Sequence, residues 1–533
     1  MILYVDYASP SVLDSNPERD MLGLSANGRR PVRFHGKVRQ HAFLLRIALR
    51  ALGEVIWSND NWLSQSDILD PIITVHPDRI FFEAFSQDQS TYGCLIVDPD
   101  IFQTSGEVIT GTTNIDFSAW LWGALGEMRT SRETHFRIGA EGFEVTTQGA
   151  GGRFEKKVDI PENWVRGFLQ VQAAMGLPGT RLSLKPIDLL NAIRFLRYTK
   201  ARVSPRALRY EFPPGEDARL VLEPWEQVIS LEGAEHSYEE FKSTRVWGRK
   251  RLKLIEGLLP FAEAVQVYLK GRALPSFYAV QMPGMTFLLG MTGWSGSAFT
   301  STGGFDLLEA EAGSDSHLVD TALALLRQRF HVSIAELAQQ LQVSETVAAQ
   351  VLVRLCRRGQ CMFDVQSRRY RHRELFEQPA DEAKYFPPDL RDELARKFLD
   401  QKQVQVVSCN VEENTKTAQL KTPEGRISRT IVHRDWRVTG NVANHGPVEV
   451  VVSNTGKIIF GRCPCSFFQE HLLNQGPCEH LLALFRASEE QRVDQPSSLP
   501  TPGTPSQPIR PNRWEVDGGY ETDENEEEEN PSP

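Results

Sequence analysis

Hydrophobic and polar positions follow two different periods in residues 1–300, so that region is predicted to contain both helices and strands. Apolar residues recur at helical spacing at 41–52, 164–175 and 187–198. Runs rich in β-branched and aromatic residues predict strands at 78–86, 94–102, 276–281 and 285–291. These elements follow one another without a regular strand–helix–strand rhythm, which favours an α+β fold over a doubly wound sheet.

A second pattern, three short helices and then two strands, occupies residues 315–376. Ser333 and Glu336 fit a capping box that opens the second helix, and Gly359 stands where the third helix should end. This order resembles a winged helix-turn-helix, whose third helix enters the major groove of DNA. The residues that would contact nucleic acid are Arg354, Arg357, Arg358, Arg368, Arg369 and Arg371.

The charge of residues 315–376 does not decide whether this segment binds DNA or protein. It contains nine arginines against six acids, but the outward face predicted for the third helix is not strongly basic and includes Glu345. The arginines of the last two strands suit phosphate contacts. They equally suit a solvated face on a segment that packs internally or binds another protein.

Composition suggests how the chain is divided. A length of 533 residues corresponds to about three or four domains. The Gly/Ser-rich residues 292–304 and the acid-rich residues 377–389 read as linkers. The predicted parts are an α+β region of one or two subdomains at 1–300, the winged-helix-like segment at 315–376, a third domain at 400–488 and a tail at 494–533.

The net charge of −10 is concentrated in that tail, which has ten acids against two arginines. The body is close to neutral, which excludes a globally basic protein that coats nucleic acid by charge alone. Proline, serine and acidic residues dominate the tail, so it is predicted to be disordered. The sequence predicts no membrane span and no signal peptide, and seven thinly spread cysteines favour a reducing, cytoplasmic location.

The sharpest chemical signal is a cysteine–histidine cluster near residue 470. Cys463 and Cys465 are followed, after twelve residues, by Cys478 and His480. Three thiolates and one imidazole suit a tetrahedral Zn²⁺ ion with no open position. Residues 448–460 predict a strand hairpin before the first pair, and a helix follows the second pair. His471 and Cys409 are the weaker candidates, because neither has a partner at ligand spacing.

This pattern, Cys-x-Cys and then Cys-x-His between a strand pair and a short helix, resembles the SWIM zinc-finger family over residues 400–488. The resemblance implies one structural zinc held by Cys463, Cys465, Cys478 and His480. It also implies binding to DNA or to proteins. Phrases such as SPRALRYEFPPGE are similar to a long bacterial group of SWIM proteins found beside MoxR-type ATPases, which implies such an ATPase system as a protein partner.

The sequence contains no motif that would bring together a nucleophile, a general base and an oxyanion-binding group. No catalytic residue is therefore predicted. We therefore expect a non-enzymatic, zinc-binding protein that works as a protein-interaction adaptor. A DNA-binding regulator is the alternative, since both recognised patterns occur in DNA-binding proteins. An unrecognised enzyme in residues 1–300 is a third hypothesis.

Overall fold

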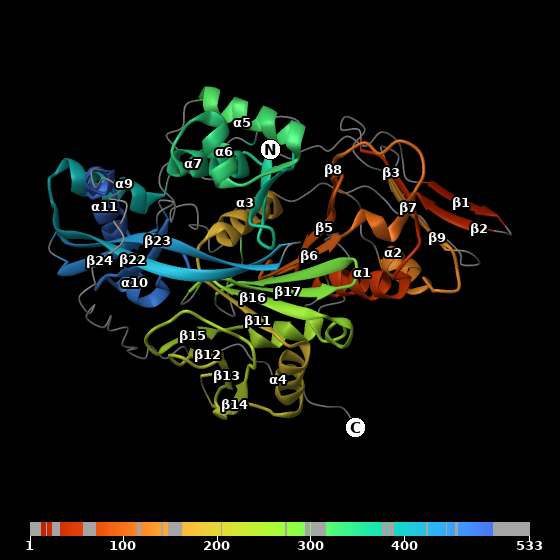
Figure 1. The fold of residues 1–533 in the computed structure, drawn as a ribbon, viewed down its shortest axis with the longest axis horizontal. Coiled ribbons are helices and arrows are strands. Elements are labelled where there is room, and N and C mark those ends of the chain that lie inside the picture. Colours follow the sequence, from red (N-terminus) through yellow and green to blue (C-terminus); the bar gives the residue numbers. More distant parts are fainter. Residues whose placement is uncertain are drawn as a thin grey trace.

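The broadest sheet of the protein has eight strands in the order β11-β16-β17-β18-β6-β5-β4-β8, and all its pairings are antiparallel (Figure 1). Its strands are β4 (Ile72–Val75), β5 (Ile80–Phe85), β6 (Thr91–Val97), β8 (Gly111–Asn114), β11 (Thr180–Leu184), β16 (Ala264–Leu269), β17 (Ser276–Met282) and β18 (Met285–Met291). Helices and antiparallel sheets coexist in one chain, so the mixed α and β character expected from the sequence is confirmed.

This computed structural model describes most of the chain. The described residues are 12–16, 19–23, 32–56, 71–114, 119–139, 142–147, 162–203, 205–271, 274–293, 299, 316–375, 380, 389–422, 425–443, 445–453 and 457–493. The predicted linkers at 292–304 and 377–389 fall largely outside these residues, and the tail at 494–533 falls wholly outside them.

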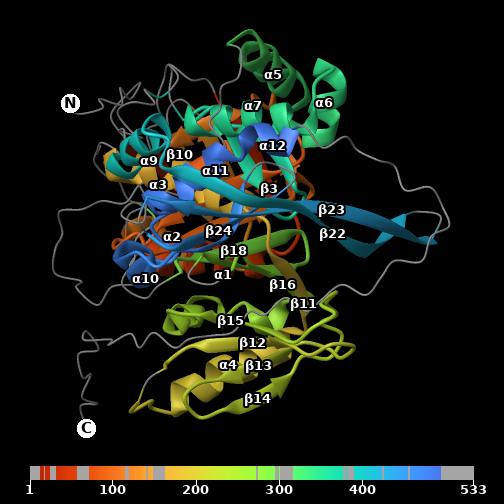
Figure 2. The ribbon, with the colours of Figure 1, turned by 90° about the vertical axis from the view of Figure 1, so that its left-hand side faces the viewer.

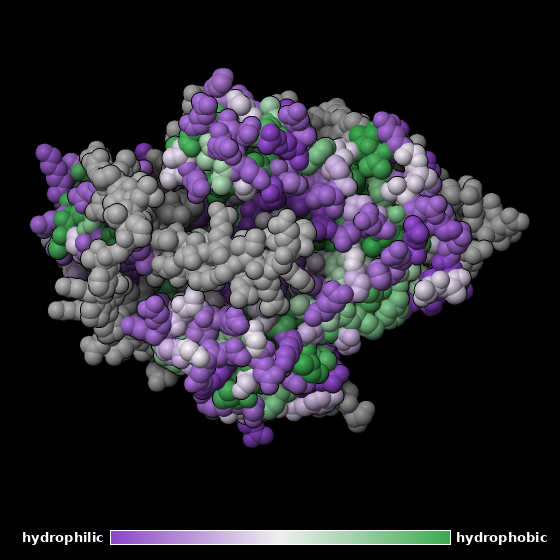
Figure 3. Space-filling model, in the orientation of Figure 1, coloured by the Kyte–Doolittle hydropathy of each residue, from purple (hydrophilic) through white to green (hydrophobic). Residues whose placement is uncertain are grey.

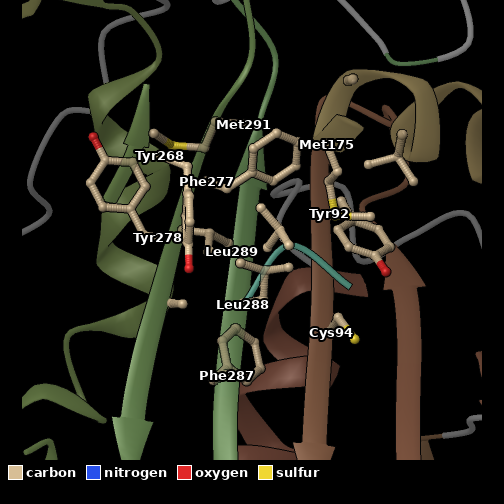
Figure 4. Close-up of a cluster of buried hydrophobic side chains, with 14 of the residues drawn as sticks. Tyr92, Cys94, Met175, Tyr268, Phe277, Tyr278, Phe287, Leu288, Leu289 and Met291 are labelled. Carbon is tan, nitrogen blue, oxygen red and sulfur yellow. The ribbon is translucent and has the colours of Figure 1, made fainter. Parts of the chain in front are cut away.

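Two helices cover the opposite faces of the large sheet. Helix α1 (Ala42–Ile56) lies against Gly93, where a Cβ atom would come within 3.0 Å of Leu52. Helix α3 (Glu162–Gly176) covers the other face, and its Phe168 ring lies 4.8 Å from that of Phe85. Figure 4 shows side chains of this core, which Tyr92, Phe277 and Met291 line together with many aliphatic residues.

One predicted strand differs from the structure. Residues 94–102 do not form a single strand, because β6 ends at Val97 and Pro99 begins a 3₁₀ turn, η1 (Pro99–Ile101). Proline has no backbone N–H for a sheet ladder, so the chain turns there and leaves the sheet. The next strand, β7 (Phe102–Thr104), belongs to a four-stranded sheet of order β10-β9-β3-β7.

The remaining N-terminal elements comprise the other three strands of this second sheet, a separate strand pair and one helix. They are β1 (Val12–Asn16), β2 (Arg19–Gly23), β3 (Phe34–Val38), α2 (Ala119–Gly126), β9 (Thr134–Gly139) and β10 (Gly142–Thr147). Strands β1 and β2 pair only with each other among the described residues.

A smaller lobe lies below the large sheet in Figures 1 and 2. It consists of α4 (Pro186–Tyr198), β12 (Leu208–Phe212), β13 (Arg219–Leu222), β14 (Gln227–Ser230), β15 (Lys242–Val246), η2 (Arg249–Ile255) and η3 (Leu259–Phe261). Glu223 is buried in this lobe between the guanidinium groups of Arg209 and Arg245, so its charge is paired on two sides.

Residues 316–375 contain the predicted three helices and two strands, with one further short strand. The elements are α5 (Ser316–Arg329), β19 (His331–Val332), α6 (Ile334–Leu341), α7 (Glu345–Arg357), β20 (Cys361–Asp364) and β21 (Arg369–His372). The capping box of Ser333 and Glu336 is confirmed, and Gly359 has the positive φ of a helix-terminating glycine.

The C-terminal elements surround the cysteine–histidine cluster. They are α9 (Leu390–Asp400), β22 (Val404–Thr422), β23 (Gly425–Val442), β24 (Pro447–Val452), β25 (Ile458–Arg462), α10 (Ser466–His471), α11 (Glu479–Ala487) and α12 (Glu489–Val493). Strands β22 and β23 are much longer than their neighbours, and Figure 2 shows them reaching past the rest of the molecule.

The visible surface is largely polar. Figure 3 shows hydrophilic residues over most of the drawn face outside the grey atoms, with hydrophobic residues scattered in small groups. Within the described part of the chain, no helix has the length and apolar character needed to cross a bilayer.

Candidate metal centre

The first two ligand residues stand at the end of a strand hairpin. Strands β24 and β25 pair antiparallel, and β25 ends at Arg462, directly before Cys463. Gly461 lets this hairpin approach the next helix, because a Cβ atom there would lie 2.7 Å from the Cδ1 atom of Leu481. The predicted hairpin is thus confirmed, although its turn at 454–456 lies outside the described residues.

Cys465 is fixed by the short helix α10 that follows it. It occupies the N-cap position, and its Sγ accepts a hydrogen bond of 3.4 Å from the backbone N–H of Phe468. The side-chain amide of Gln469 donates to the Cys463 carbonyl over 2.9 Å. These bonds hold the Cys-x-Cys turn in one conformation.

The second pair opens helix α11. Cys478 is its N-cap residue, and His480 lies in its first turn, as the sequence predicts. The guanidinium of Arg391 donates to the carbonyls of Gln475 and Pro477, at 2.6 and 3.2 Å. Arg391 belongs to α9, so a helix that is distant in sequence fixes the position of the residues directly before Cys478.

The structure brings all four predicted ligands together. One ligand atom from each of Cys463, Cys465, Cys478 and His480 lies within 4.8 Å of the other three. All four residues are buried, with exposed fractions of 0, 7, 0 and 2%. Sulfur atoms around tetrahedral Zn²⁺ are about 3.7 Å apart, so this cluster has the size and donors to hold one metal ion.

The packed sulfur atoms change how the thiols titrate. The contact with Cys478 lowers the pKa of Cys463 to about 4 and the pKa of Cys465 to about 7. The pKa of Cys478 is raised, chiefly because its thiol donates to those two sulfur atoms. A metal needs thiolates as ligands, and this arrangement makes at least one thiolate readily available.

The imidazole of His480 is enclosed by groups that orient it. Its Nδ1 atom lies 3.5 Å from a carboxylate oxygen of Glu479 and makes no hydrogen bond, which leaves Nε2 for the thiols. Burial lowers the pKa of His480, but contacts with Cys463 and Cys465 outweigh it and raise the pKa to about 9. The ring also stacks on Phe398 of α9, with centroids 5.4 Å apart.

The weaker ligand candidates lie outside the cluster. His471 is half-buried at the end of α10, where its ring contacts Phe467 and its Nε2 lies 3.8 Å from Glu470. Cys409 is half-buried on β22 and is not part of the metal-sized group. Arg391 and Phe398 support the site but were not predicted, because they precede Cys463 by 72 and 65 residues.

The six arginines named as nucleic-acid contacts do not form one open face. Arg371 is only 3% exposed and donates to Asp364 and to Asp78, which lies in the turn between β4 and β5. Arg369 is paired with Glu336. Arg368 is exposed, whereas the three arginines at the C-terminal end of α7 and its cap are half-buried. Those three are Arg354, Arg357 and Arg358.

Neither any family model nor any curated protein sequence matches this chain.

Proposed function

We propose that this protein binds one structural zinc ion, is not an enzyme, and recognises a macromolecule, mainly as a protein-interaction adaptor. The observation that carries the proposal is the buried cluster of three thiols and one imidazole. Soft thiolate and imidazole donors suit Zn²⁺. Four protein ligands complete a tetrahedron and leave no position for water or substrate, so the metal would supply folding free energy rather than catalysis.

The proposal includes a SWIM-type module in residues 400–488. Its support is the order of elements, in which a strand hairpin precedes Cys463 and Cys465, and Cys478 and His480 open a helix. Because α11 packs against β22, β23 and β24, zinc at its N-terminus would fix the surface that these strands present.

The adaptor role is supported by how residues 316–375, the proposed winged-helix-like segment, are packed. Helix α7 contacts α3, and the backbone N–H of Phe363 donates to the side chain of Gln172 over 2.7 Å. Arg373, directly after β21, forms a buried ion pair with Glu83 of the large sheet. Other parts of the same chain therefore cover much of α7 and of the strands that follow it. This packing favours protein contacts by the segment over recognition of DNA bases.

A MoxR-type ATPase system is the partner that the family resemblance suggests. A DNA-binding regulator is the second candidate function, and the observation that favours it is the net positive charge of residues 404–442, which hold six lysines and arginines against four acids although the whole chain carries −10.

Metal analysis of the purified full chain tests the zinc centre. We expect about one zinc per chain, lost in Cys478→Ser because a tetrahedral site with three ligands binds the ion far more weakly. Cys409→Ser is the matched control and should keep its zinc, since Cys409 lies outside the cluster. A wild-type chain purified without chelator and free of zinc would contradict the proposal.

Sedimentation of the zinc-loaded chain with a MoxR-type ATPase tests the adaptor role. The expected result is a complex with the wild type and with Cys409→Ser, but not with Cys478→Ser. A chain that holds its zinc and still sediments alone would contradict this role while leaving the metal centre standing.

A further inference from the structure

Six neighbouring residues at the end of α4 form an exposed surface on the smaller lobe. Helix α4 buries Leu189, Leu190 and Ile193 and contacts β14, η2 and η3. Its last turn and the segment after it are largely exposed instead. The exposed residues, called the α4 surface below, are Arg194, Arg197, Tyr198, Lys200, Arg202 and Val203.

The α4 surface carries an excess of positive charge. Residues 189–210 contain six lysines and arginines and no acid, although the whole chain carries −10. Arg197 of the surface is paired with Glu256. The other three cations of the surface have no acidic side chain of the described residues within ion-pair distance. Three unpaired positive charges at one helix end attract an anionic partner.

Apolar side chains are exposed within the same surface. Tyr198 is 82% exposed, more than any other large hydrophobic side chain among the described residues, and Val203 is 62% exposed. Cations alone at the end of a helix are ordinary, because they offset the partial negative charge of its terminal carbonyls. Exposed apolar groups gain nothing from the helix terminus and are stabilised when a partner covers them. Tyrosine and arginine together are also typical of the residues that dominate protein contacts.

We infer that the α4 surface binds an acidic segment of the same chain, residues 515–529, which lies outside the described residues. The segment has nine acids and no lysine or arginine, and it includes Tyr520. Its charge is opposite to that of the α4 surface, so its carboxylates can pair with the cations there. An aromatic ring such as that of Tyr520 can also pack on the guanidinium of Arg194 or Arg202.

The segment can reach the α4 surface from where it is attached. Val493 is the last described residue, and 21 residues separate it from Glu515. A chain of that length spans up to about 70 Å at roughly 3.4 Å per residue. A compact protein of 533 residues has a radius of gyration of about 24 Å, so this length is enough to cross the body. The tether holds the segment at a local concentration on the order of millimolar, at which weak ion pairs are still occupied.

Other occupants fit the α4 surface less well. A second copy of the same surface would be repelled by its own positive charge. An anionic membrane has the right charge, but two exposed apolar side chains would bury little area in it. The acidic segment of the same chain also competes at a higher local concentration. The inference goes beyond the proposed function, because an acidic partner that used this surface would first have to displace residues 515–529.

Carbodiimide cross-linking of the full chain, read by mass spectrometry, tests the inference. This reagent joins a lysine amine directly to a carboxylate that contacts it. We expect Lys200 to be joined to acids of residues 515–529 in the same chain, with a lower yield at about 500 mM salt than at about 50 mM, because salt screens exposed charges. Lys397 and Lys402 are the reference, since they are exposed on and directly after α9. Helices α9 and α12 both contact α11, so a segment that merely stayed near its attachment would reach these two lysines first.

A pair of variants separates the α4 surface from the rest of the chain. Arg194→Glu, Arg202→Glu leaves Lys200 as the reporter and should lower its cross-linking yield at least about 5-fold, because two attractions become repulsions. Lys397→Glu, Lys402→Glu is the matched control, which changes the net charge by the same amount and should keep the Lys200 yield. All four substituted positions are exposed, so both variants should keep the wild-type melting temperature.

A third variant changes the segment and leaves the α4 surface intact. Its substitutions are Glu526→Gln, Glu527→Gln, Glu528→Gln and Glu529→Gln. They remove four of the nine negative charges and should lower the yield between Lys200 and the five acids that remain, because the segment is held less strongly. This variant leaves every described residue unchanged, so a lower yield cannot come from a misfolded lobe.

Several results would overturn the inference. One is a wild-type yield at Lys200 no higher than at Lys397 and Lys402, and another is an equal Lys200 yield in wild type and Arg194→Glu, Arg202→Glu. Cross-links that join an isotope-labelled chain to an unlabelled one would assign the segment to a second copy. Binding to phosphatidylserine vesicles that the same double variant abolishes, without any Lys200 cross-link, would assign the α4 surface to a membrane. None of these results bears on zinc content, so the proposed metal centre is tested separately.

Discussion

At the scale of single residues, the ring of His480 has neighbours on several sides, among them the ring of His445 with centroids 4.3 Å apart. Thiols lie on one side, the Glu479 carboxylate lies 3.5 Å from Nδ1, and Phe398 covers the ring face. A carboxylate that accepts a hydrogen bond from the second nitrogen of a metal-binding imidazole fixes its tautomer and raises its basicity, and the Glu479 carboxylate is the acceptor nearest to Nδ1 for such a bond. Glu479 therefore orients a ligand without being one.

Substitution Glu479→Gln should weaken zinc binding by roughly 10- to 100-fold, because the imidazole loses its charged partner. Competition with a zinc chelator measures the change. Glu470→Gln is the control, since Glu470 lies beside His471 outside the cluster. Equal zinc affinity in Glu479→Gln and wild type would show that other contacts orient the ring.

His76 is a second residue whose chemistry depends on burial. Its Nε2–H donates to the carbonyl of His372 over 2.6 Å, and its Nδ1 makes no hydrogen bond. Burial lowers the pKa of His76 to about 4; the bond to His372 opposes this shift, and nearby Arg371 reinforces it. The neutral imidazole thus links the large sheet to the strand β21.

This pKa makes the protein less stable in acid. In the unfolded chain, His76 has the ordinary histidine pKa of 6.5. Between pH 6.5 and 4 the unfolded protein therefore binds a proton at His76, whereas the folded protein does not. Stability is present above pH 6.5 and is lost as the pH falls toward 4, by roughly 3 kcal/mol. His76→Gln keeps the donor but does not titrate. Denaturation of both proteins from pH 7 to 4 should show that extra loss only in the wild type.

At the scale of elements, the contact between β23 and α11 depends on one glycine. A Cβ atom at Gly440 would lie 2.5 Å from both the Gln405 carbonyl oxygen and Leu484. The backbone oxygen cannot move without breaking the β22–β23 ladder. The strand and the helix that carries two ligands can approach each other only because this position has no side chain.

Gly440→Val should destabilise the C-terminal module by a few kcal/mol, because overpacking forces β23 and α11 apart. Thermal unfolding with excess zinc measures the loss. Gly123→Ala is the control, since a Cβ atom there meets nothing within 4 Å, and helical Gly→Ala should be neutral or slightly stabilising. An unchanged melting temperature in Gly440→Val would mean that the two elements separate at little cost.

Many of the helices, and the four clustered ligand residues, could be predicted from the sequence. Helices α1, α3 and α4 are predictable because each has an apolar stripe at helical spacing, and Ser333 with Glu336 marks the start of α6. The four clustered side chains can be identified from spacing alone, since a short turn and a helix start constrain where each points.

Other features depend on contacts that local patterns do not contain. Strand β6 pairs with β18, some 190 residues later, so the order of the large sheet could not be predicted from residue periods. The long pairing of β22 with β23 was not predicted, because residues 412–435 lack the alternation of apolar and polar positions that is typical of a half-buried strand. Arg391 could not be predicted because its role depends on where α9 docks.

At the scale of the whole molecule, one ion pair joins distant parts of the chain. Arg373 and Glu83 are both fully buried, and Arg373 donates two hydrogen bonds of 2.7 Å to the carboxylate. The hydroxyl of Tyr92 donates to the same carboxylate over 2.7 Å. The pair fastens residues 316–375 to the large sheet at a point that water does not reach.

Arg373→Met should destabilise the protein by about 3–5 kcal/mol, because it leaves a buried carboxylate without its counter-charge. Adding Glu83→Gln should recover more than half of the loss, since the amide is neutral and still accepts from Tyr92. Chemical denaturation of the single and double variants measures both effects. A double variant no more stable than Arg373→Met would show that the charge of Glu83 is not what costs stability.

The same ion pair sets an order of events during synthesis of the chain. Glu83 and Arg373 are 290 residues apart, so the carboxylate leaves the ribosome roughly 15 to 60 s before its partner exists, at about 5–20 residues per second. Until Met291 has been made, the large sheet also lacks β16, β17 and β18. The first hundred residues therefore wait with an exposed strand edge until β18 is made, and Glu83 waits without its counter-charge until residue 373. The nascent chain should engage chaperones over this interval.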